Sequence, residues 1–152
     1  EKKWLNMMKS KLGLVGDNKD DLDLINSLLN WMKKNKADYT NTFCYLMNIS
    51  ISDEIYKKKS FLDWETKWKK RLRLDKSNIK NQIDLMRKVN PIIIPRNHKV
   101  EEALSDANSE NLKTIDDLLS ILENPYNPNC DVSKFQLPSS KNNNKYQTFC
   151  GT

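Results

Sequence analysis

Cysteine thiols are among the few groups in this chain whose type could do chemistry. The three cysteines, Cys44, Cys130 and Cys150, are an odd number at wide spacing, and no CxxC pair or His–Cys cluster accompanies them. A structural zinc site or a disulfide framework is therefore not expected. Cys150 stands third from the C-terminus in a polar segment, where a thiol can reach other groups and exchange. From composition alone, an incidental cysteine is the simpler interpretation.

The only histidine, His98, follows Arg96 and Asn97 where a helix is expected to begin. An imidazole can do acid–base work near neutral pH, but no second histidine, cysteine or serine stands in local partnership with it. Capping or packing is therefore the favoured role, and no catalytic residue is predicted.

Four aspartates, Asp17, Asp20, Asp21 and Asp23, resemble a carboxylate cluster for a hard cation. A calcium loop needs ligands at alternating positions, a central glycine and a terminal glutamate, and these do not line up here. Attraction to the positive end of a helix dipole accounts better for the aspartates, and no metal site is predicted.

The positive charge of the chain is concentrated in residues 57–80. This stripe holds ten Lys or Arg against three carboxylates, while the whole chain has a formal charge of +6. Such a stripe could meet nucleic acid, an anionic membrane or an acidic protein. Trp64 and Trp68 could stack on bases there. Their three- and four-residue spacing with Phe61 and Leu72 instead favours a buried helical stripe.

Composition limits the kind of protein further. The 152 residues suit a single domain, and 38% apolar with 30% charged residues indicates a thin core or a missing neighbour. Three glycines exclude a P-loop or dinucleotide-binding loop. No apolar run is long enough to span a membrane. Because the sequence starts at Glu1 without a signal peptide, a cut piece or processed product is expected.

Helical periodicity dominates the pattern and predicts an all-α fold. The clearest amphipathic helix follows Asp20, with one face formed by Leu22, Ile25, Leu28, Leu29 and Met32. Asn90-Pro91 and Asn124-Pro125 end two later helices, since proline disfavours helical geometry in the preceding residue. Residues 1–125 are thus expected to form six or seven short helices in an orthogonal bundle, and residues 126–152 an irregular tail.

Several stretches, taken in order, resemble the C-terminal portion of the selenoprotein O family, pseudokinases that act as protein adenylyltransferases. They are KLGL at 11–14, ADYTNTF at 37–43, the W…W…RL pattern at 64–72, NP at 90–91, RN at 96–97 and LENPY at 122–126. The residues in these stretches with an expected structural role are Asp38, Thr40, Thr42, Phe43, Asn90, Pro91, Arg96, Asn97, Pro125 and Tyr126. Pro95, His98 and the reduced Leu137-Pro138 stretch depart from the family pattern.

The resemblance implies a parent enzyme that transfers AMP from ATP to Ser, Thr or Tyr of proteins with magnesium, in a kinase-like fold. The residues that bind ATP and Mg²⁺ would lie upstream, so this segment alone should be inactive and would pack on the upstream core. Cys150-Gly151-Thr152 is similar to the family's ending, which implies a redox role for Cys150, with oxidation joining it to an upstream cysteine. The family further implies protein substrates, and a mitochondrial location in eukaryotes or a cytoplasmic one in bacteria. The lack of a long apolar run predicts that no membrane is involved.

Two other hypotheses remain. The first is a stand-alone basic helical module that binds nucleic acid or an acidic protein through residues 57–80. The second is a purely structural helical scaffold, in which Cys150 is dispensable. The resemblance makes nucleic acid the less expected partner.

Overall fold

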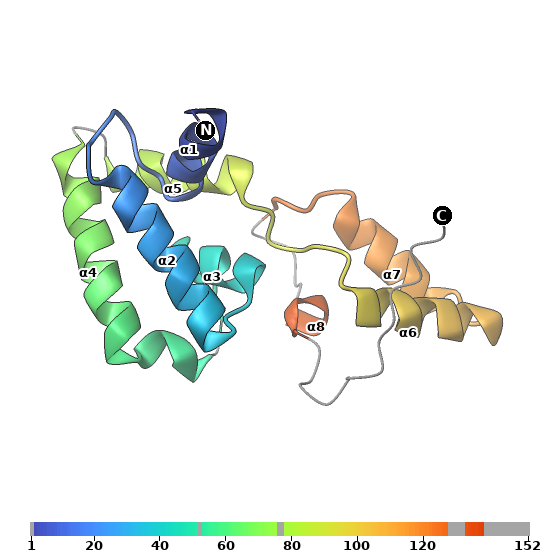
Figure 1. The fold of residues 1–152 in the computed structure, drawn as a ribbon. Helices are drawn as coiled ribbons and strands as arrows, with labels where there is room; N and C mark the ends of the chain where they lie inside the picture. Colours follow the sequence, from blue (N-terminus) through green and yellow to red (C-terminus); the bar gives the residue numbers. More distant parts are fainter. Residues whose placement is uncertain (1, 52, 76–77, 128–132, 139–152) are drawn as a thin grey trace.

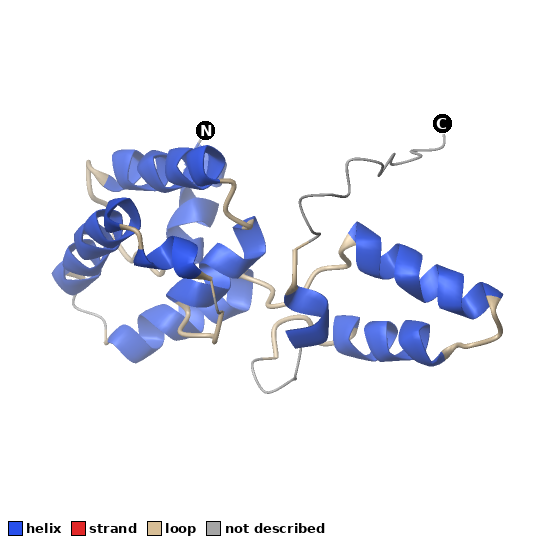
Figure 2. Ribbon diagram, turned by 90° about the horizontal axis from the view of Figure 1, so that it is seen from below, coloured by secondary structure: helices blue, strands red, loops and turns tan. Residues whose placement is uncertain are grey.

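The described part of the chain is helical throughout. The computed structural model describes residues 2–51, 53–75, 78–127 and 133–138, and within these ranges there are eight α-helices, one 3-10 helix and no strand (Figure 2). The helices are α1 (Lys2–Lys11), α2 (Asp21–Asn35), α3 (Tyr39–Leu46), η1 (Glu54–Lys57), α4 (Lys59–Leu74), α5 (Ile79–Val89), α6 (Asn97–Asn108), α7 (Lys113–Leu122) and α8 (Ser133–Gln136). The predicted all-α class is confirmed.

The helices form a bundle and a projecting hairpin. In Figure 1, α1 to α5 make the bundle, within which α2 packs on α4 and α1 packs on α5. Helices α6 and α7 lie side by side and extend away from it, with α8 near the point where the two parts meet (Figures 1 and 2). The extended segment 91–95 connects them. The fully apolar run 92–95 predicts a buried extended segment; Ile92 and Ile93 are buried, whereas Ile94 is half-buried and Pro95 is exposed.

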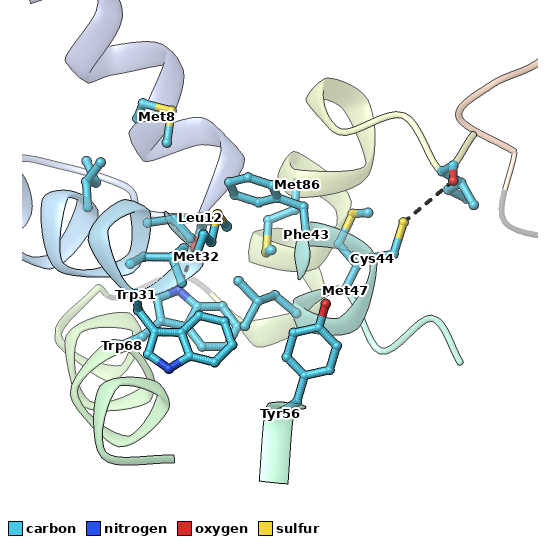
Figure 3. Packing of buried hydrophobic residues seen from close by; sticks show 14 of the residues in the cluster. Met8, Leu12, Trp31, Met32, Phe43, Cys44, Met47, Tyr56, Trp68 and Met86 are labelled. Atoms are coloured by element: carbon cyan, nitrogen blue, oxygen red, sulfur yellow. Dashed lines mark hydrogen bonds between the residues drawn. The ribbon is translucent and has the colours of Figure 1, made fainter. Parts of the chain in front are cut away.

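Trp64 and Trp68 belong to the core of the bundle. Both are 5% exposed, and their rings stack with centroids 6.0 Å apart. Each indole N–H donates a 2.9 Å hydrogen bond to a backbone carbonyl, Trp64 to that of Leu24 and Trp68 to that of Leu12. The predicted core stripe is confirmed, and stacking on bases is wrong because the ring faces are covered. Figure 3 shows Trp68 among the buried residues of the neighbouring helices.

The loop after α1 passes close to α5. Gly13 has φ +68°, and a Cβ placed there would lie 3.0 Å from the backbone oxygen of Gln82. Only glycine meets both conditions without strain. The sequence predicts that the first helix ends near Gly13, and α1 ends at Lys11, so this glycine follows the helix end and also sets the approach of α1 to α5.

The buried face of α2 differs from the predicted one. Leu22 is 45% exposed, and Leu24 takes its place in the core. The reason is that Asp21, at the first position of the helix, is itself buried in ion pairs, which turns the helix so that Leu22 points to solvent.

For α7, the sequence pattern predicts a start at Thr114, a capping box with Asp117, and an inward face of Ile115, Leu118, Leu119 and Leu122. The start, the capping box and the position of Leu119 are wrong. The helix begins at Lys113 without a side-chain cap, so Thr114 does not start it and Asp117 completes no capping box. The Thr114 hydroxyl instead donates to the carboxylate of Asp106 on α6. Leu119, predicted to face inward, is 56% exposed.

One turn of helix, α8, lies within the segment for which the sequence predicts an irregular tail. Its Phe135 is only 3% exposed. The Gln136 side chain donates to the Ile92 carbonyl at 3.4 Å, and the Gln136 carbonyl accepts from the Asn41 side chain at 3.1 Å. One buried aromatic and these two hydrogen bonds therefore hold the turn in place, although the surrounding composition is polar.

Candidate functional site

Two of the motif residues, Asp38 and Arg96, form an ion pair where the bundle meets the hairpin. Arg96 Nη1 donates to Asp38 Oδ2 at 2.7 Å and Nη2 donates to Asp38 Oδ1 at 3.0 Å, while Nη2 also reaches Asn41 Oδ1 at 3.2 Å. Asp38 is at the same time the N-cap of α3, because its carboxylate accepts from the Asn41 amide at 2.8 Å. The pair thus joins the start of α3 to the start of α6.

The electrostatics of Asp38 favour its charged form. Burial acts to raise the pKa of this carboxyl, but the hydrogen bonds from Arg96 and from the Asn41 amide outweigh it and hold the pKa below its usual value. At neutral pH Asp38 is therefore an ionised hydrogen-bond acceptor and not a general acid.

Asn90 makes a second connection, between the ends of α1 and α5. Its side-chain amide donates to the carbonyls of Lys11 and Met86, both at 2.9 Å, and its oxygen accepts from Lys11 Nζ at 3.1 Å. Because Asn90 is 1% exposed and fully paired, its role is structural. Pro91 follows directly and ends the helical geometry.

The motif threonines and phenylalanine of α3 face the interior. The Thr42 hydroxyl is hydrogen-bonded to the Asp38 carbonyl at 2.7 Å and lies 3.2 Å from the Tyr56 hydroxyl. Phe43 is 1% exposed, and the Lys11 ammonium lies 5.2 Å from its ring centroid. Thr40 is also buried.

The remaining motif residues lie around the segment that leaves α5. The Pro125 carbonyl accepts from the Ile92 amide at 2.7 Å, which brings the end of the hairpin back to the bundle. Asn97, the first residue of α6, and Tyr126 are exposed. The structure therefore brings the motif residues together at a structural junction, with these two at its surface.

Cys44 is the one cysteine within the described residues, and it is buried at this junction. Its Sγ lies 3.7 Å from the Ile92 carbonyl, the contact drawn in Figure 3. Burial, with a smaller contribution from the Asp38 charge, raises the pKa of the thiol to about 12. Cys44 is therefore a protonated, structural thiol. Cys130 and the predicted redox residue Cys150 lie outside the described residues.

Neither His98 nor the aspartates form a catalytic constellation. His98 is half-buried near the start of α6, where burial and the charges of Lys99 and Arg96 lower its pKa. In the described ranges, no group of three or more His, Cys, Asp or Glu residues could hold a metal ion.

Asp21 belongs instead to a buried ion-pair network that sequence reasoning missed. Arg71 Nε donates to Asp21 Oδ1 and Arg71 Nη1 to Asp75 Oδ1, both at 2.7 Å. Lys9 Nζ lies 3.7 Å from Asp21 Oδ2 and also pairs with Asp17. The sequence has no local signal for the Asp21–Arg71 pair because the two residues are 50 positions apart.

The basic stripe has fewer available cations than its sequence suggests. Arg71 is buried, Lys57 pairs with Glu54, and Lys69 pairs with Glu65. Other lysines of the stripe, such as Lys59, Lys67 and Lys70, are exposed on α4. The described part of the stripe therefore presents exposed lysines on α4, but not the aromatic platform that single-stranded nucleic acid would use.

A groove of about 750 Å³ lies between residues 45–51, α4 and α5. Trp68, Leu72 and Met86 are among its lining residues, and its charged groups include the Glu65–Lys69 ion pair. This apolar groove carries no nucleophile paired with a base. None of the described helices has the length and hydrophobicity needed to cross a membrane.

Comparison with known proteins identifies the family. The family model described as protein adenylyltransferase SelO matches residues 1–123. The chain is 51% identical to the protein nucleotidyltransferase YdiU of Pelagibacter ubique, 38% identical to that of Nitrosococcus oceani and 40% identical to that of Bacillus cereus strain ATCC 14579. Each match covers the whole of this chain but only 31–32% of the relative. Because this family model matches most of its length, this chain belongs to the SelO family of protein adenylyltransferases.

Proposed function

We propose that this chain is the C-terminal helical portion of an enzyme that transfers AMP from ATP to Ser, Thr or Tyr residues of proteins, and that it packs against an upstream kinase-like core. The match to the SelO family over residues 1–123 carries the proposal. The relatives are named protein nucleotidyltransferases, and this chain spans about a third of their length.

The described residues do not fit a site for Mg²⁺ and ATP. Lys9 and Arg71, which could hold phosphates, are buried against the chain's own carboxylates, and no acidic cluster suited to a metal ion is found among the described residues. We assign ATP and magnesium, and the recognition of protein substrates, to the upstream part, as the resemblance to the family implies. The contribution of this chain is to support that part through the junction of Asp38, Arg96 and Asn90. The compartment would be the cytoplasm in a bacterium and the mitochondrion in a eukaryote.

The proposal is tested by incubating labelled ATP and Mg²⁺ with the full-length parent and, separately, with this 152-residue chain. We expect AMP to become covalently attached to protein only in the presence of the parent. Labelling by this chain alone would overturn the division of roles, and a parent that transfers no AMP would overturn the function itself.

Cys150 is proposed as a redox regulator of the parent. The protonated Cys44 thiol, buried in the core, is a poor candidate for exchange, which leaves Cys130 and Cys150 in this chain. We expect AMP transfer by the wild-type parent to differ between oxidised and reduced protein, and the C150S variant to lose this difference. A C130S variant is the matched control and should keep it. Identical oxidised and reduced rates in the wild type would contradict the proposal.

A further inference from the structure

The α6–α7 hairpin has a small interior. The two helices run antiparallel and are joined by residues 109–112, and they lie against each other along their length (Figure 1). Ala103 on α6 and Leu118 and Thr114 on α7 are the buried positions of these two helices. Helices of 12 and 10 residues are at or below the length at which a helix is stable without packing.

Three leucines of the hairpin are exposed on one face. Leu104, Leu112 and Leu119 have exposed fractions of 47%, 57% and 56%. Leu104 and Leu119 each come one residue after a buried position, Ala103 or Leu118. One residue turns a helix by about 100°. Since the helices are antiparallel, these turns have opposite senses when viewed along one direction, and both side chains reach the same face.

Further apolar residues border this face. Leu112 precedes Leu119 by seven residues, two helical turns, so it lies on the same side of α7. Val100, Ile115 and Leu122 are half-buried at the edge of the face. These six residues, which we term the hairpin ridge, form a one-sided apolar surface. The opposite face includes the exposed carboxylates of Glu102 and Asp117.

An exposed apolar face on a two-helix layer indicates a third element that covers it. The remaining 139–152 segment is poorly suited, because Tyr146 and Phe149 are its only large apolar residues. A second copy of the hairpin is also disfavoured. Residues 97–123 contain seven carboxylates against two lysines, so two hairpins would bring like charges together.

We propose that the hairpin ridge docks on the upstream portion of the parent polypeptide, at an apolar surface edged by lysine or arginine side chains. The relatives extend over about three times the length of this chain, which supplies enough protein to cover the ridge. Because the hairpin is acidic, the surface that it meets is expected to be basic. This inference rests on the proposed role of the chain as part of a larger enzyme.

The test compares a L104E/L119E double variant in the full-length parent and in this 152-residue chain. In the isolated chain both leucines are solvated, so we expect the thermal midpoint to change by no more than about 2 °C. In the parent, we expect the midpoint of this region to fall by at least about 5 °C, and amide exchange in α6 and α7 to accelerate at least about tenfold. The milder L104A/L119A variant should also lower the thermal midpoint more in the parent than in the isolated chain, but by a smaller amount.

A L62E/L74E variant is the matched control, because Leu62 and Leu74 are exposed leucines on α4, outside the hairpin. Its effect should be the same in parent and isolated chain. Equal effects of L104E/L119E in the two forms would overturn the proposal. A dimeric sedimentation mass of the isolated chain that becomes monomeric in L104E/L119E would also overturn it, because a second copy would then cover the ridge. So would a parent without residues 139–152 in which L104E/L119E no longer lowers the midpoint, because that segment would then cover the ridge. These readouts do not use AMP transfer, so the docking can fail while the proposed function stands.

Discussion

Replacing Arg71 by alanine is expected to lower the free energy of unfolding of this chain by about 3–5 kcal/mol. Arg71 is 7% exposed and pairs with Asp21, which is 2% exposed, and with Asp75. Its guanidinium also donates to the Val15 carbonyl at 3.2 Å. The alanine variant would leave the Asp21 carboxylate buried with only Lys9, 3.7 Å away, as a cationic neighbour. Removing one member of a buried pair costs more than the pair itself contributes, because the other charge stays desolvated.

Urea denaturation of the wild type and R71A measures this loss as a lower transition midpoint at an unchanged slope. The matched control is R73A, because Arg73 lies two residues along the same helix and is exposed. Its effect should stay within about 0.5 kcal/mol. If the two variants unfolded at the same urea concentration, the buried network would contribute nothing to stability.

Replacing Asp38 by alanine should cost about 2–4 kcal/mol and loosen the hairpin from the bundle. The carboxylate of Asp38 caps α3 and accepts two hydrogen bonds from Arg96 at 2.7 and 3.0 Å. The cap accounts for about 1 kcal/mol and the charged hydrogen bonds for the rest. Urea denaturation gives the total, and amide exchange in α6 and α7 reports on the hairpin. D63A, which removes an exposed carboxylate on α4, serves as the control.

The contribution of Asp38 should also depend on pH in a defined direction. The folded-state pKa of this carboxyl is lowered, so its stabilisation is fully present above the unfolded-state pKa of about 4. It is lost as the pH falls from there through the folded-state pKa. The difference in unfolding free energy between the wild type and D38N should therefore shrink below about pH 4. A difference that stays constant down to pH 2 would show that the charge of Asp38 is not what stabilises the junction.

The helices and much of the core could be predicted from the sequence. The spacing of Phe61, Trp64, Trp68 and Leu72 predicts a buried stripe on α4, and all four are buried. Asn90-Pro91 ends α5 where predicted. These signals are local, because helical periodicity, capping and proline geometry act within a few residues of each other. The family could also be recognised from the sequence, because its short motifs occur in the expected order.

The faces that the helices present, and the partners of their charged residues, were decided only by the tertiary structure. Asp21 and the aspartates beside it look alike in the sequence, but Arg71, 50 residues away, makes Asp21 a buried ion-pair member. Asp38 and Arg96 are 58 residues apart, and their separate motifs meet as one ion pair at the junction.

Leu119 shows, within one helix, the difference between what the sequence predicts and what the tertiary structure decides. Its place in the pattern of α7 predicts an amphipathic helix, and the helix is there. Which side of it α6 covers depends on the angle at which the two helices pack. The sequence by itself therefore determined where helices form and which family they belong to, because those depend on neighbouring residues. The pairing of buried charges and the exposure of the hairpin ridge depend on contacts between distant segments, which only the folded chain brings together.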